Sequence, residues 1–245
     1  MTISGLLHRR QFMKRGLIFI GALHYFTHTV FAQSQEKTML TDIQKALVPI
    51  AAFAAEGAIN PLKKALNDGL DQKVTINAIK EVLVQTYAYA GFPRSLNALS
   101  ALMEVVKERK SAGKNDVAGK DASPVPTDKS MLEIGTEIQT KLVGKPVAGP
   151  LFDFAPAIDR FLKSHLFGDI FIRDNLDYKT REVATIAMLA SLQGAQSQLQ
   201  SHYQMGMNTG LAKEDLQEIV AILTTKVSPE IGKRAAEVLE IFLKG

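Results

Sequence analysis

Apolar residues recur at helical spacing through most of the chain after residue 39, and this period constrains the fold more than any other feature. Leu40, Ile43, Leu47 and Ile50 fall on one side of a helix, and the stretch 77–90 shows the same spacing. Ala and Leu, which both favour helices, dominate these segments. The pattern therefore predicts an all-α fold.

The second half of the chain repeats motifs of the first half in the same order. The matched stretches are Asn67–Leu70 with Asn208–Leu211, Ile79–Val82 with Leu216–Ile219, and Phe92–Arg94 with Ser228–Glu230. An internal duplication of a helical unit is the simplest explanation. We expect two tandem repeats that pack pseudo-symmetrically, because either unit alone would expose an apolar face.

The repeats are predicted at residues 33–110 and 131–245. Residues 111–130 combine Gly, Ser, Pro and alternating charge without an apolar face, which predicts a flexible linker. Within the repeats we expect a short helix 62–66 stopped by a left-handed Gly69, and a helix over 157–165. Asp177 is expected to cap a helix that begins near Thr180.

Residues 1–32 are typical of an export signal. Arg9 and Arg10 open a basic segment, an apolar run from 16 to 31 follows, and Ala32 ends a stretch that a signal peptidase accepts. The arrangement resembles a twin-arginine signal, so we expect a periplasmic or secreted protein. The alternative is an uncleaved anchor, but the apolar run of about 15 residues is shorter than the ~20 that a span needs. No stable membrane span is expected after processing.

The composition excludes several classes of function. The net charge of +4 comes from four basic residues in 1–32, and their removal leaves 25 basic against 25 acidic residues. No basic face is implied, so no nucleic-acid partner is expected. The chain has no Cys, which excludes disulfides, thiolate metal sites and thiol redox chemistry. Only His165 and His202 remain after residue 32, so we expect neither a metal site nor a cofactor.

Three stretches share the motifs of one known family in the family's order: LFGDIFIRDNLDYKTREVATIAMLASL, QLQSHYQMGMNTGLAKEDLQEIVAIL, and YAYAGFPRSLNAL after ALNDGL. The sequence resembles the carboxymuconolactone decarboxylase family, which includes the alkylhydroperoxidase D-like proteins. The resemblance implies an all-α fold of short antiparallel helices and a homo-oligomer, a trimer or a hexamer.

One branch of this family uses a Cys-x-x-Cys pair that ends four residues before a His. In this sequence the corresponding positions hold Ala195 and Gln198, ahead of His202. Neither side chain can be oxidised reversibly. The sequence is therefore similar to the other branch, which lacks the cysteines and decarboxylates a lactone acid. That similarity implies a small carboxylate or lactone as the substrate.

Decarboxylation of an unsaturated lactone acid leaves an electron pair that spreads to the lactone carbonyl, and the resulting dienolate must then receive a proton. His202 is the candidate general acid, and Glu182 the candidate residue that orients it. Gly206, one turn after His202, is expected to leave open space beside the ring. The candidates for binding the substrate carboxylates are Arg181, Arg94, Gln198 and Ser201.

Each of these residues also has a purely structural interpretation. A lone helical His is more often a surface or core residue than a catalyst, and this interpretation is favoured for His165. Glu182 can simply stabilise the start of its helix, and Arg94 can belong only to a helix junction. The first repeat has Lys63 or Lys64 near the place of His202, so we expect it to scaffold without catalysing.

Two other functions remain possible on the sequence. The protein could be an exported oligomer that binds a small metabolite or a partner without catalysis. A peroxidase activity, as in the Cys-containing relatives, is disfavoured by the missing thiols.

Overall fold

The computed structural model describes residues 40–245, and within that range it contains helices and no strand. The all-α prediction is confirmed. The expected signal peptide 1–32 and the residues up to 39 lie outside the described residues. Between residues 40 and 245, no helix is both long enough and apolar enough to cross a membrane.

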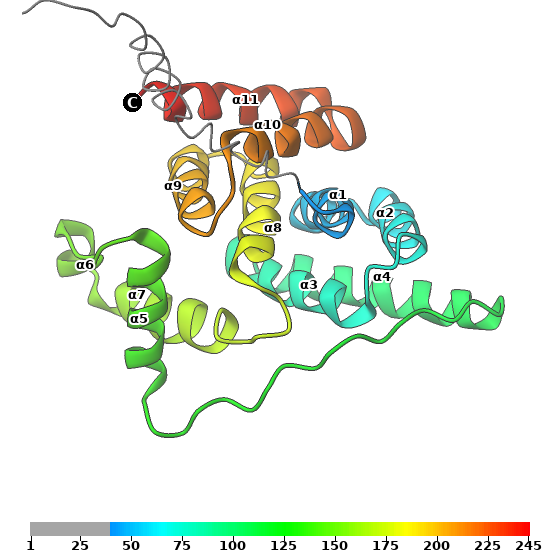
Figure 1. Ribbon diagram of the computed structural model, residues 1–245, viewed down its shortest axis with the longest axis horizontal. Coiled ribbons are helices and arrows are strands. Elements are labelled where there is room, and N and C mark those ends of the chain that lie inside the picture. The colour runs from blue at the N-terminus through cyan, green and yellow to red at the C-terminus, as the bar shows by residue number, and fades with distance from the viewer. Residues whose placement is uncertain (1–39) are drawn as a thin grey trace, which may run out of the picture. The chain divides into compact units, whose positions relative to one another are not determined.

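Two helices form the centre of the fold: α1 (Asp42–Glu56) and α8 (Tyr178–Ser191) lie side by side (Figure 1). Every residue of α8 from Thr180 to Ser191 is buried, as expected for a helix that is surrounded on all sides. Small side chains let α1 and α8 approach closely. The expected N-cap Asp177 is confirmed, because its side chain accepts the backbone N–H of Thr180. Thr41 caps α1 in the same way, through the backbone N–H of Gln44.

A set of helices follows each central helix. The first set is α2 (Ile59–Asp71), α3 (Ile76–Ala90) and α4 (Phe92–Ser111). The second is α9 (Gln196–Asn208), α10 (Lys213–Ile222) with its π-helical continuation η2 (Leu223–Val227), and α11 (Pro229–Lys244). Each member of the second set begins 137 positions after its counterpart, as Ile59 and Gln196 show, whereas α1 and α8 begin 136 positions apart, at Asp42 and Tyr178.

The two sets interlock through the central helices, since α1 contacts α10 and η2 while α8 contacts α3. Lys45 of α1 pairs with Glu218 of α10 at 2.8 Å. At the corresponding positions, Arg181 of α8 pairs with Glu81 of α3 at 3.2 Å. Helix order, lengths and packing partners thus agree with two tandem repeats, although the duplication itself stays a prediction.

The structure corrects the expected stop at Gly69. Helix α2 continues to Asp71, and Gly69 has no positive φ. A Cβ at Gly69 would lie 3.0 Å from Ile50 Cδ1, so this glycine serves the packing of α2 on α1. When α2 and α9 are aligned by their first residues, Gly69 corresponds to Gly206. A Cβ at Gly206 would lie 3.3 Å from Ile186 Cδ1. The pairing of Asn67–Leu70 with Asn208–Leu211 was therefore wrong by about one helical turn.

Four short helices separate the two sets: α5 (Met131–Val143), α6 (Pro150–Phe154), α7 (Pro156–Phe161) and the π-helix η1 (Leu162–Ile170). The single helix expected over 157–165 is therefore divided between α7 and η1. Helix α5 packs closely on η1, and the glycines Gly135 and Gly168 stand where the two backbones meet. The local sequence could not reveal this contact, because it depends on two segments that are distant along the chain.

Residues 112–130 contain no helix, but they are attached to the rest of the protein. The carbonyls of Val117 and Ala118 accept the first free N–H groups of α3, at 3.0 and 2.8 Å. Farther along, Lys120 and Ser123 bond to Asp174. These bonds attach part of the segment to α3 and to Asp174, whereas its flexibility as a linker stays a prediction.

Candidate functional site

Arg181 and Glu182 are consecutive residues of α8 that point to different neighbours. Successive side chains on an α-helix are rotated by about 100°. Arg181 therefore faces α3, where it meets Glu81, whereas Glu182 faces α9, where it meets His202. Since α8 is surrounded by helices, both charged side chains are fully buried.

The structure brings Glu182 and His202 together, as the sequence hypothesis required. Glu182 Oε2 lies 2.7 Å from His202 Nδ1. A carboxylate at this distance accepts the Nδ1–H, which fixes the ring and its tautomer. The other ring nitrogen, Nε2, makes no hydrogen bond within residues 40–245 and is not among the fully enclosed polar atoms of that range. His202 thus offers Nε2 to solvent from a ring that is only 8% exposed.

Tyr89, in the last turn of α3, completes this cluster from the other set of helices. Its ring meets that of His202 edge-on, with the centroids 5.6 Å apart. Burial raises the pKa of the Tyr89 hydroxyl, and the nearby Glu182 raises it further. The residue was missed by sequence reasoning, because its approach to His202 depends on packing between segments more than a hundred residues apart. Only its place in the motif YAYAGF could have drawn attention to it.

Three enclosed polar atoms of this region have no hydrogen-bond partner among the described residues: Tyr89 Oη, Arg181 Nε and Glu182 Oε1. Buried polar groups are rarely left unpaired, because each costs free energy until a partner is found. All three atoms are shielded from solvent, so a water molecule or a polar group of a ligand reaches them only after a local rearrangement.

Arg181 has a different role from the one expected. Its Nη1 donates to Gln85 Oε1 at 2.9 Å, and its Nη2 donates to Glu81 at 3.2 Å and to the Arg173 carbonyl at 2.7 Å. Both ends of the guanidinium fork are thus occupied by the protein. This arrangement corrects the expectation that Arg181 grips a substrate carboxylate, since a bidentate grip needs those same N–H groups.

Glu81 is the buried anion that balances Arg181. Its carboxylate also accepts bonds from Arg173 at 2.7 Å and from Asn175 at 2.9 Å. Burial alone would raise the pKa of Glu81, but these hydrogen bonds and the two positive charges outweigh it and hold that pKa below its ordinary value. This network of hydrogen bonds and ion pairs holds α3 against α8 beside the candidate site.

The remaining predicted binding residues are not joined to His202 by any hydrogen bond or ion pair of the described chain. Arg94 donates to the Ala55 carbonyl at the end of α1, which agrees with its interpretation as a junction residue. Gln198 and Ser201 are exposed on α9 and bond locally to Ser197. Their roles in substrate binding stay predictions.

Two further expectations concern the surroundings of the site. Gly206 does not leave open space, because a Cβ there would lie 2.8 Å from Leu211 Cδ1. His165 is half-exposed and bonds to Asp169 at 2.6 Å, one turn away on the same helix. In the part of the chain that is described, no group of three or more His, Asp or Glu side chains is placed to hold a metal ion.

Part of the chain is similar to known proteins. Residues 156–239 match the Carboxymuconolactone decarboxylase family. The chain is also 28% identical over 97 residues to a "4-carboxymuconolactone decarboxylase" from Acinetobacter baylyi, an overlap that covers 38% of this chain and 72% of the relative. The family match includes Glu182 and His202, whereas Tyr89 and Glu81 lie outside it. At the level of the family, a decarboxylase-like protein is thus supported over residues 156–239.

Proposed function

We propose that the protein is a carboxymuconolactone decarboxylase-like lyase, which decarboxylates or transfers a proton to a small lactone or unsaturated carboxylic acid. The observation that supports this proposal is the Glu182–His202 pair, in which a buried carboxylate fixes Nδ1 and leaves Nε2 open. The pair lies in the stretch that matches the family.

In the proposed reaction the C–C bond to the carboxylate breaks and CO2 leaves. The electron pair stays on the substrate and spreads to the lactone carbonyl as a dienolate. His202 then donates the proton on Nε2 to carbon, while Glu182 holds the ring through Nδ1 and stabilises the imidazolium that precedes transfer. A general acid of this kind contributes about 10²–10⁴-fold. No cofactor is needed, because the conjugated carbonyl itself accepts the electrons.

The test is turnover of 4-carboxymuconolactone by purified protein, followed by proton NMR of substrate and product. His202→Asn removes the general acid, and we expect kcat to fall by about 10²–10⁴-fold. Glu182→Gln keeps a hydrogen-bond acceptor but removes the charge, so we expect a smaller loss in kcat. His165→Asn is the matched control and should leave turnover unchanged. Undiminished turnover by His202→Asn would rule out the assignment.

We propose as the alternative that the protein is an exported, non-catalytic homo-oligomer that binds a small metabolite or a partner. The predicted signal supports export, and several large apolar side chains of α6 and α7 are exposed, Phe154 by 88%. Thermal-shift measurements with lactones and small dicarboxylates, alongside light scattering for the oligomeric state, test this possibility. Ligand binding without turnover in the wild type would favour it over the lyase.

Peroxidase activity is the third and weakest candidate, because it is known from relatives that use cysteines and this chain has none. Consumption of hydrogen peroxide by the purified protein without added metal would revive it.

A further inference from the structure

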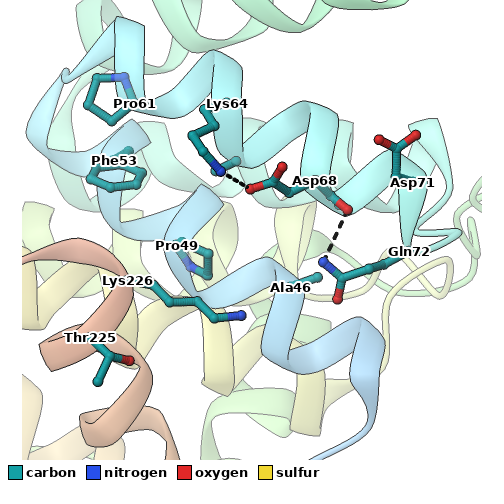
Figure 2. Close-up of a pocket in the computed structure, with 12 residues that line it drawn as sticks. Ala46, Pro49, Phe53, Pro61, Lys64, Asp68, Asp71, Gln72, Thr225 and Lys226 are labelled. Carbon is teal, nitrogen blue, oxygen red and sulfur yellow. Dashed lines mark hydrogen bonds and ion pairs between the residues drawn. The ribbon is translucent and has the colours of Figure 1, made fainter.

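A groove with a volume of about 730 Å³ lies between α1, α2 and η2, away from the candidate site (Figure 2). Its apolar wall consists of Pro49 and Phe53 of α1 and Pro61 of α2. Lys64 lines it from α2, and Lys226 lines it from η2. Like the cluster around His202, the groove is therefore built from both sets of helices.

When the two sets are aligned by their helix boundaries, this groove takes the position of the candidate site. Ala46 of α1 stands where Glu182 stands in α8, and Ala65 of α2 stands where His202 stands in α9. Both alanines line the groove. Methyl groups thus replace the carboxylate and the imidazole, which removes the proton-transfer pair and leaves space for a ligand.

The third counterpart is Lys226, which occupies the place of Tyr89. Its ammonium group makes no ion pair or hydrogen bond within residues 40–245, and Figure 2 shows it reaching across α1 toward Gln72. The other charges of the groove are already paired. Lys64 bonds to Asp68 at 2.6 Å, and Asp71 is held by cations of α4 and of the segment after it. The available charge in the groove is therefore positive.

We propose that this groove binds a small organic carboxylate with a flat apolar body, and that it does so without catalysis. The carboxylate pairs with Lys226, and the apolar body lies on Pro49, Phe53 and Pro61. No acid or base stands at positions 46 and 65 to transfer a proton. The first set of helices thus keeps a binding function after losing the chemical one.

The test is an NMR titration of the ¹⁵N-labelled full-length protein with benzoate. We expect the amide signals of Ala65 and Gly69 to shift with benzoate and to remain unchanged with benzamide, which has the same ring but no charge. Lys226→Gln should raise the dissociation constant of benzoate about tenfold, as expected for the loss of one charge-assisted bond. The matched control is Lys233→Gln, an exposed lysine of α11 outside the groove, and it should bind benzoate like the wild type.

Binding of benzoate in the groove can be tested independently of the proposed lyase activity. His202→Asn should keep the benzoate shifts at Ala65 and Gly69 even if turnover is lost. Three results would overturn the inference: unchanged affinity in Lys226→Gln, equal binding of benzamide, or shifts confined to the region of His202. Groove signals that respond to protein concentration and not to benzoate would likewise overturn it, since they indicate that a second copy of the chain occupies the groove.

Discussion

Arg181 and Glu182 illustrate how adjacent residues on one buried helix acquire different tasks. Arg181 is bound by Glu81, Gln85 and a carbonyl, and it holds α8 against α3. Glu182 has one oxygen on His202 and one enclosed oxygen without a partner among the described residues, so its described role is to hold the imidazole. At the scale of the residue, the partner of each side chain therefore decides its role.

Tyr89→Phe tests whether the enclosed hydroxyl takes part in the reaction. The Tyr89 Oη has no partner in the described chain, so its removal should leave the free energy of unfolding unchanged or slightly increased. If the hydroxyl stabilises the developing oxyanion, kcat should fall about tenfold or more with little change in KM. Urea unfolding and steady-state kinetics measure the two effects separately. Unchanged kcat would exclude Tyr89 from the chemistry.

Glu81→Gln tests the buried ion pair with Arg181. At neutral pH it leaves the buried guanidinium without its counter-charge, and we expect a loss of about 3–5 kcal/mol in the free energy of unfolding. The native pKa of Glu81 lies below its ordinary value of 4.5, so the stabilisation is present above that pH and is lost as the pH falls through the native pKa. The difference between wild type and variant should therefore narrow below pH 4.5.

Urea unfolding at several pH values between 7 and 3 measures this trend. Glu104→Gln, which removes an exposed pair with Lys63, is the control and should show little change at any pH. A difference that widens as the pH falls would contradict the assignment of Glu81 as the stabilising anion.

At the scale of the element, the boundaries of helices and their internal conformation have different origins. The N-cap Asp177 acts on a backbone group three residues away, so local sequence was sufficient to predict it. Gly69 was predicted to end its helix but lies within α2. The space left by its missing side chain is filled by Ile50 of α1. Tertiary packing thus overrode the local signal.

Gly135→Ala tests the close contact between α5 and η1. A Cβ at Gly135 would lie 1.6 Å from the Lys163 carbonyl oxygen, and a backbone atom cannot move aside as a side chain can. We expect α5 and η1 to separate, with a loss of at least about 1–3 kcal/mol in the free energy of unfolding. Amide hydrogen exchange over 131–170 should increase in parallel.

Gly69→Ala is the matched control, because its new Cβ would meet side chains and no backbone: the flexible end of Ile50 at 3.0 Å and Val74 Cγ2 at 3.8 Å. That variant should be much less destabilised than Gly135→Ala, since the gain in helix propensity offsets part of the strain. Equal losses in the two variants would contradict the described contact between α5 and η1.

At the scale of the whole molecule, the two sets of helices depend on each other. The central helices α1 and α8 bury one another, and each places a cation against the second helix of the set that follows the other: Lys45 against α10, and Arg181 against α3. Gln44 also donates to Thr180 across the same contact, at 3.1 Å. Neither half can therefore satisfy its central helix alone.

Separate expression of residues 33–130 and 131–245 tests this dependence. We expect neither fragment to unfold cooperatively as a monomer, because α8 would expose apolar surface and Arg181 would lose Glu81. Mixing the fragments should restore cooperative thermal unfolding by circular dichroism. A fragment 131–245 that melts cooperatively as a monomer in the ultracentrifuge would contradict the expectation.

The sequence by itself determined the all-α class, the approximate helices, the N-cap Asp177 and the exclusion of thiol chemistry, because these depend on residue type and on spacing over a few positions. It also singled out Glu182 and His202. Only the tertiary structure decided that Arg181 is bound by Glu81, that Tyr89 borders His202, and that Lys226 lines one groove together with Ala46. Each of these pairings joins segments distant along the chain, so it depends on how whole helices pack and not on any local pattern.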